Sequence, residues 1–345
     1  DVALQLQLDP FRLRLGRLQI DDGGSTLTVE GHAEAGSDGW NVSVDAGLDT
    51  ITPPRLLELW PTQAKPKTRR WLEENLKGGK LSNVDVAVRL APGAGPRTYL
   101  AFEYADAEVR FMKTMPHVQD AHGHASLLDN RFVLGLDAGR VIAPQGGAVN
   151  IAGSSFIMPD VRVKGGPPAV VRLHTESTVT AALSLLNQPP MRVMDKVKLP
   201  VTLADGRAEL DGTLSFPLRK GGKPEDVTYH FDGTLSDLSS DTLVKDRTLR
   251  VPNMTLAATN ERLTIAGEGR LDGIGFDARW SQRIGPGSDS STLTGQIALS
   301  PHTLEAFGIL LPPGSVSGEG KADISLALKR GRPPAFTLTS DLRGL

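Results

Sequence analysis

Two histidines in the stretch DAHGHASLLD come nearest to a metal-binding arrangement in this sequence. His122 and His124 are separated by one residue, so on a β-strand both side chains would point to the same face. Imidazoles at this spacing could hold a divalent metal ion, and Asp120 and Asp129 lie in the same stretch. A metal site needs a third ligand of suitable reach, and none is evident nearby. We therefore expect two water-facing strand histidines and no metal.

The glycine-rich stretch GEGRLDG, residues 267–273, is the nearest approach to a phosphate-binding loop. A dinucleotide-binding loop has the spacing G-x-G-x-x-G and opens a helix. Here the spacing is G-x-G-x-x-x-G, and no helical pattern follows it. The stretch is therefore expected to form a β-hairpin.

Catalytic motifs of the common hydrolases and nucleotidases are missing from the sequence. It contains no G-x-S-x-G, H-E-x-x-H or Walker motif. Glu73 and Glu74 are adjacent carboxylates, but neighbours on a helix diverge by about 100°. These two are expected to form a solvated face with Arg69 and Arg70. We predict no catalytic residue, no cofactor and no enzymatic activity.

The composition excludes several classes of protein. The 345 residues include no cysteine, which rules out disulfides and thiolate metal sites, and no apolar run approaches the roughly 20 residues of a membrane-spanning helix. The 38 basic and 40 acidic residues nearly balance, which argues against a nucleic-acid partner. Because the chain begins at Asp1 without an initiator Met, we interpret it as a piece of a longer protein.

Short runs of alternating apolar and polar residues recur along the chain, beginning with DVALQLQLD. This alternation is typical of β-strands with one apolar face. Asp-Gly pairs are turn signals, so VTLADGRAELDGTLSF is interpreted as strand, turn, strand, turn, strand. We expect a mainly β fold, an elongated and curved antiparallel sheet with a few short helices at its rim. The apolar positions predicted to line its inner face are Leu4, Leu6, Leu8, Val84, Val86, Val88, Leu90, Leu214, Phe216, Ile324, Leu326 and Leu328.

Four short helices are predicted between the strands, in TPPRLLELW, PKTRRWLEENLKGG, STVTAALSLLNQPP and SPHTLEAF. Thr52 is the expected N-cap of the first, and Gly78 the expected end of the second. Thr52 and Ser300, which precede the first and fourth helices, lie 248 residues apart, and half that distance leads to residue 176, where the third begins. A repeat of about 124 residues is therefore expected. The approximate units within one array are 1–115, 116–235 and 236–345.

Two long segments resemble the YhdP-like branch of the AsmA-like proteins of Gram-negative bacteria. The first is LLELWP…KTRRWLEENLKGGKLSNVDVAVRL, residues 56–90, where a Trp-Pro and an Arg-x-Trp-Leu helix precede a glycine and a strand. The second is LRVPNMTLAATNERLTIAGEGRLDGIGFDARWSQRI, residues 249–284, with a G-x-G-x-L-D-G turn and a strand ending near Trp280.

The resemblance implies a periplasmic, bridge-like lipid transfer protein of the bacterial envelope. Such a protein is anchored in the inner membrane by an N-terminal helix that this chain lacks. Its long sheet carries phospholipid by the acyl chains between the inner and outer membranes, and outer-membrane or periplasmic proteins would be further partners.

The residues themselves are compatible with two arrangements of the apolar rows. The rows could pack against each other across a β-sandwich, which would suit a structural scaffold or partner-binding module of the envelope. They could instead line an open trough for hydrocarbon chains. The small number of predicted helices and the prevalence of Val, Leu and Ala in the rows favour the trough.

Overall fold

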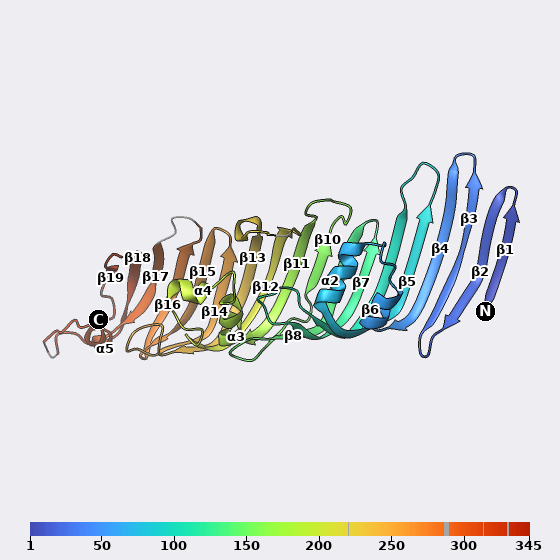
Figure 1. Ribbon diagram of the computed structural model, residues 1–345. Coiled ribbons are helices and arrows are strands. Elements are labelled where there is room, and N and C mark those ends of the chain that lie inside the picture. The colour runs from blue at the N-terminus through green and yellow to red at the C-terminus, as the bar shows by residue number, and fades with distance from the viewer. Residues whose placement is uncertain (220, 286–289, 313, 330) are drawn as a thin grey trace. The chain divides into compact units, whose positions relative to one another are not determined.

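The computed structural model describes residues 1–219, 221–285, 290–312, 314–329 and 331–345. Its nineteen strands belong to one hydrogen-bonded sheet, and every strand pair with a described register is antiparallel (Figure 1). Five short α-helices and one 3-10 turn connect them. The expected fold class, mainly β with one antiparallel sheet and a few short helices, is confirmed.

The chain divides into two compact units, each formed by several segments. Unit 1 comprises Asp1–Ile142, Asn150–Leu173 and Ser215–Val227, and unit 2 comprises Ala143–Val149, His174–Leu214 and Thr228–Leu345. The three approximate sequence units remain a prediction, because this division describes compactness and not repetition.

Unit 1 is a meander in which each strand pairs with the next one along the chain from β1 to β8. Its elements are β1 (Val2–Leu8), β2 (Phe11–Asp21), β3 (Thr26–Gly36), β4 (Gly39–Ile51), α1 (Pro53–Leu59), α2 (Pro66–Asn75), β5 (Leu76–Leu90), β6 (Arg97–Val109), β7 (Val118–Leu128), β8 (Arg131–Ile142), β10 (Ser155–Met158) and the 3-10 turn Pro224–Asp226.

Unit 2 repeats the same meander from β13 to β19. Its elements are α3 (Val179–Leu186), α4 (Val193–Val197), β13 (Thr228–Ser240), β14 (Leu249–Thr259), β15 (Arg262–Leu271), β16 (Ile274–Arg283), β17 (Ser290–Leu299), α5 (Pro301–Ala306), β18 (Gly320–Lys329) and β19 (Ala335–Thr339). Residues of β9 (Ala148–Asn150), β11 (Pro168–Thr178) and β12 (Asp205–Pro217) contribute to both units.

Three helices begin at similar intervals, as the sequence repeat predicts. Their N-caps are Thr52, Thr178 and Ser300, which are 126 and 122 residues apart. The hydroxyl oxygens of Thr178 and Ser300 accept hydrogen bonds from the third backbone N–H that follows each, which satisfies one of the unpaired donors of the first turn. The second helix differs from the prediction at its end. Gly78 does not stop it, because α2 ends at Asn75 and the chain passes directly into β5.

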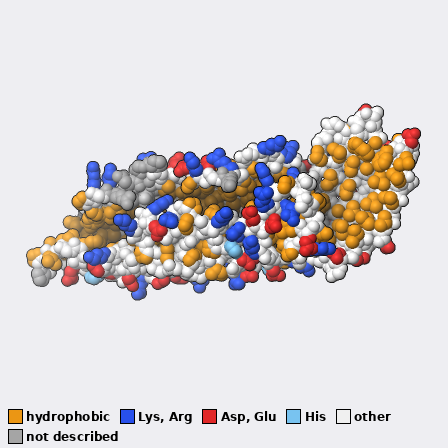
Figure 2. Space-filling view, in the orientation of Figure 1, with side chains coloured by type: hydrophobic (Ala, Val, Ile, Leu, Met, Phe, Trp, Pro, Cys, Tyr) orange, Lys and Arg blue, Asp and Glu red, His pale blue; other side chains and the backbone are white. Residues whose placement is uncertain are grey.

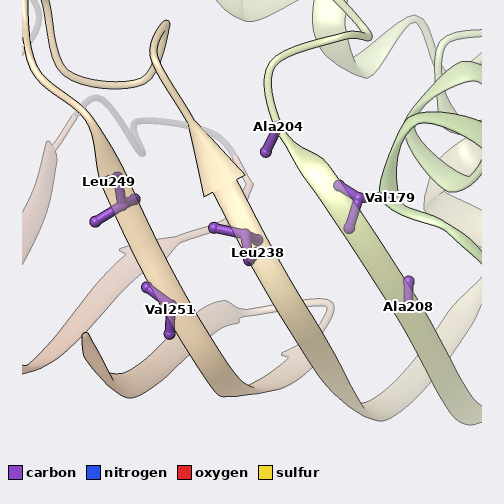
Figure 3. Packing of buried hydrophobic residues seen from close by; sticks show 6 residues of the cluster. All are labelled: Val179, Ala204, Ala208, Leu238, Leu249 and Val251. Carbon is purple, nitrogen blue, oxygen red and sulfur yellow. The ribbon is translucent and has the colours of Figure 1, made fainter. Parts of the chain in front are cut away.

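Figure 3 shows the largest buried cluster of unit 2, where α3 meets the ends of three strands. Side chains of α3, of β12 and the residue just before it, and of β13 and β14 pack together there. A second cluster joins the end of β17 to the start of β18 beside α5, and in unit 1 a third joins the end of β6 to the start of β7. Within each unit, these clusters therefore lie at one end of its strands.

The expected turns inside VTLADGRAELDGTLSF do not form, since Asp205–Pro217 is one continuous strand, β12. Gly212 lies in mid-strand, and a Cβ atom added there would overlap the ring of Phe231 on β13. Likewise, a Cβ atom at Gly233 would overlap the side chain of Leu210. Gly212 and Gly233 therefore provide space for a side chain of the neighbouring strand, and not a reversal of the chain.

Gly212→Ala is expected to lower the free energy of unfolding by about 1–3 kcal/mol, because Phe231 must leave its position. Gly275→Ala on β16 is the matched control, since a Cβ atom there meets no other atom within 4 Å. Urea denaturation of both variants measures the difference. Equal stability of the two variants would contradict the packing of Phe231 over Gly212.

Candidate functional site: an uncovered apolar face of the sheet

The predicted rows of β1 and β5 lie on one face of the unit 1 sheet. Leu4 pairs with Leu15 of β2, Leu15 with Gly31 of β3, Gly31 with Val44 of β4, and Val44 with Val88 of β5. Directly opposed residues of an antiparallel sheet project to the same side. Leu4 and Val88 therefore lie on the same face of the sheet, although β2, β3 and β4 separate their strands. The same registers place on it the remaining predicted residues of these strands, Leu6, Leu8, Val84, Val86 and Leu90.

The apolar row continues beyond β5 to the strands that follow. Val86 pairs with Leu100 of β6, Leu100 with Leu127 of β7, and Leu127 with Phe132 of β8. Sequence reasoning did not select these last three residues, because β6 to β8 are less regular in their alternation. The register shifts within β5–β6 and β6–β7 show where the alternation is interrupted.

The opposite face of unit 1 is polar and charged. Gln5, Arg14, His32, Ser43 and Arg89 occupy successive paired positions there. Ion pairs cross it as well, Arg12–Glu34 at 2.9 Å and Arg89–Asp45 at 2.7 Å. Only the apolar face therefore has the composition of a hydrocarbon-binding surface. Figure 2 shows this face as an open wall of hydrophobic side chains over β1 to β5.

Unit 2 has an apolar face built in the same way. Leu326 of β18 pairs with Leu293 of β17 and with Phe336 of β19, while Leu293 pairs with Trp280 of β16 and Trp280 with Ile265 of β15. The predicted residues Ile324 and Leu328 lie on the same side, two residues before and after Leu326. Figure 2 shows hydrophobic side chains in a hollow over β17 to β19.

The predicted pair Leu214 and Phe216 lies near the end of β12. Alternation along this uninterrupted strand puts both on the side of Gly212, the side on which the ring of Phe231 lies. Both side chains are partly exposed.

None of the twelve predicted lining residues is buried. Leu4, Leu6 and Leu8 keep 59%, 53% and 75% of their surface exposed, and those of the other strands are half-buried by their neighbours in the sheet. The adjacent helices of unit 1 pack loosely, since Pro53 is the one buried residue of α1 and no residue of α2 is buried. The apolar face is thus open to solvent at β1 and partly exposed at β5, β12 and β18.

A row of small residues crosses the apolar face of unit 2. Gly267, Ala278 and Gly295 are directly opposed on β15, β16 and β17. Larger side chains border this row, with Trp280 on one side and Phe276 on the other. The row runs across the strands, a direction that the sequence pattern of a single strand cannot reveal.

A separate group of titratable residues lies on the polar face of unit 2. His174 of β11 and the pair Glu209 and Asp211 of β12 bring one ligand atom each within 4.8 Å of the others. The hydrogen bond between His174 Nδ1 and Asp211 Oδ1, 2.8 Å long, is the main cause that raises the pKa of His174. Sequence reasoning missed this group because its members come from two strands, and only the spacing Glu-x-Asp was visible.

His122 and His124, the candidates from the sequence, do not form such a group. On β7, His124 is exposed and His122 is partly exposed. His122 Nε2 lies 3.4 Å from Asp106 Oδ1, and His124 Nδ1 lies 3.5 Å from Asp137 Oδ2. Each imidazole thus has its own carboxylate, and the two face no common third ligand within the part of the chain that the structure describes. The stretch GEGRLDG forms the predicted hairpin, in which Asp272 and Gly273 turn the chain between β15 and β16.

Comparison with known proteins gives no relative. No family model matches the chain, and no curated protein or solved structure matches it either. The resemblance to the AsmA-like proteins therefore stays a prediction. Among the described residues, no helix is long and apolar enough to cross a membrane.

Proposed function

We propose that this chain binds phospholipid by the acyl chains on the apolar face of its sheet and lets the lipid pass along that face, without catalysing a reaction. The observation that carries the proposal is the apolar row that continues from strand to strand in each unit and none of whose predicted residues is buried. In the AsmA-like interpretation, the chain is the periplasmic part of an envelope protein anchored in the inner membrane. Lipid would move there between the inner and outer membranes.

The energetics support hydrocarbon as the ligand. Burial of one methylene group contributes about 0.8 kcal/mol, so an acyl chain of about 15 carbons gains roughly 12 kcal/mol when it leaves water. The attraction is non-directional, so aliphatic side chains can accept acyl chains of different length and let them slide. Exposed apolar patches of this kind mark binding sites in soluble proteins.

The alternative function, a structural scaffold or partner-binding module, requires that the apolar rows be buried by protein. A scaffold built as a β-sandwich needs two sheets whose rows bury each other. All nineteen strands of the described residues belong to one sheet. A partner protein that covers the face is the remaining version of this alternative, and the experiment below distinguishes it from lipid.

Native mass spectrometry of the chain, purified from a Gram-negative host without detergent, tests the proposal. We expect mass additions equal to one or more phospholipids, which organic extraction removes and identifies. After delipidation, incubation with phosphatidylethanolamine–phosphatidylglycerol vesicles should restore the additions. A chain that shows only its own mass both after purification and after incubation would overturn the proposal. A bound protein in place of lipid would favour the partner-binding module.

A further inference from the structure

The group His174, Glu209 and Asp211 on the polar face of unit 2 has the composition of a metal site. Its three ligand atoms lie within 4.8 Å of one another. Zinc bonds of about 2.0–2.2 Å would place neighbouring ligand atoms roughly 3.3 Å apart. His174 Nδ1 and Asp211 Oδ1 are already 2.8 Å apart, so only the more distant ligand atoms need to approach, by at most about 1.5 Å. Glu209 and Asp211 are both exposed, so their carboxylates have room to rotate.

Carboxylates lie close to the imidazole of His174. Asp211 Oδ1 lies 2.8 Å from Nδ1 and Glu176 Oε1 lies 3.8 Å from Nε2, while Glu209 belongs to the same group. In the described parts of the chain, neither Glu209 nor Asp211 forms an ion pair with a lysine or arginine. The carboxylates of Glu209 and Asp211 therefore lie beside one imidazole, and a bound divalent cation would remove their mutual repulsion.

The backbone that carries these ligands is held by the core. Thr175 follows His174 on β11 and is buried, and Ala208 precedes Glu209 on β12 and is buried in the cluster of Figure 3. Ligands on strands that are fixed in this way are positioned more accurately than ligands on loops.

We propose that His174, Glu209 and Asp211 bind a first-row divalent transition metal, with Zn²⁺ the best fit, on the face of the sheet opposite the apolar one. One imidazole and two carboxylates are common zinc ligands, and solvent completes the coordination. The imidazole selects Zn²⁺ over Mg²⁺ and Ca²⁺, which take oxygen ligands, and the Irving–Williams order places Zn²⁺ above Mn²⁺. Because the ligands come from β11 and β12, the ion would join these two strands.

Isothermal titration of the untagged, chelator-treated chain with ZnCl₂ tests this site. We expect saturable binding of Zn²⁺. His174→Ala and Asp211→Asn should each weaken the Zn²⁺ affinity by more than about tenfold, because even the loss of a residue that only supports a metal ligand costs about this much. Zn²⁺ should also raise the melting temperature of the parent chain and not that of His174→Ala.

His230→Ala is the matched control for this titration. His230 lies on β13, and its Nε2 atom is 2.8 Å from Asp232 Oδ2, but no third ligand joins this pair among the described residues. The control should bind Zn²⁺ like the parent chain. Binding only in the millimolar range by the parent chain, binding unchanged in His174→Ala, or an equal loss in His230→Ala would each overturn the site. Circular dichroism establishes that each variant is folded before it is titrated.

Discussion

Leu326→Asp is expected to remove at least nine-tenths of the phospholipid that the chain carries after purification. Leu326 lies between Leu293 and Phe336 in the apolar row of unit 2. A carboxylate at this position must lose its water when an acyl chain covers it, and an unpaired buried charge costs several kcal/mol. One kcal/mol already changes a binding constant about fivefold, so bound lipid should fall far below the parent level. Lipid phosphorus per chain after extraction, together with native mass spectrometry, measures the loss.

Ser325→Asp is the matched control for Leu326→Asp, because it places the same charge one residue earlier on β18. Ser325 pairs with Thr294 and Thr337, so its side chain lies on the other face of the sheet. This variant should keep its lipid. Val86→Asp should behave like Leu326→Asp, since Val86 lies between Ala46 and Leu100 in the apolar row of unit 1. Unchanged lipid in both Val86→Asp and Leu326→Asp would show that these rows do not line the lipid path.

The apolar rows could be predicted from the sequence because their signal is local. Alternation with a period of two determines which side chains share a face, and Val84 to Leu90 keep this period without interruption. The period of two is interrupted within β13. Asp237 has a positive φ of 52°, and Leu235 and Leu238, three residues apart and not two, join the same core cluster.

Contacts between strands could not be predicted from the sequence. An Asp-Gly pair signals a turn when the glycine is needed for its backbone, but Gly212 is needed for the space that Phe231 occupies. The strand that supplies Phe231 has to be placed before this reason becomes visible. The same holds for His174, whose partners Glu209 and Asp211 follow more than 30 residues later on another strand. Which end of the apolar face the helices cover depends on tertiary packing as well.

Leu238→Ala is expected to lower the free energy of unfolding by about 2–5 kcal/mol, whereas Leu6→Ala should change it by less than about 0.5 kcal/mol. Leu238 is only 7% exposed and packs with Val179, Leu249 and Val251, so its removal leaves a cavity that the surrounding side chains cannot fill. Leu6 belongs to the apolar face but is 53% exposed, and its removal leaves no cavity. Urea denaturation of the delipidated chain and of each variant measures both changes.

The contrast between the two leucines distinguishes a covered sheet from an open one. If the apolar face were closed by a second layer in solution, Leu6 would be part of a core and its truncation would cost as much as that of Leu238. Equal losses would therefore remove the basis for a lipid-binding face. A large decrease in the free energy of unfolding for Leu238→Ala alone would show that the apolar side chains of β1 do not contribute to folding stability. This is expected of side chains that bind a ligand. Addition of phospholipid should then stabilise the parent chain more than Leu6→Ala, because the variant offers less apolar surface to the acyl chain.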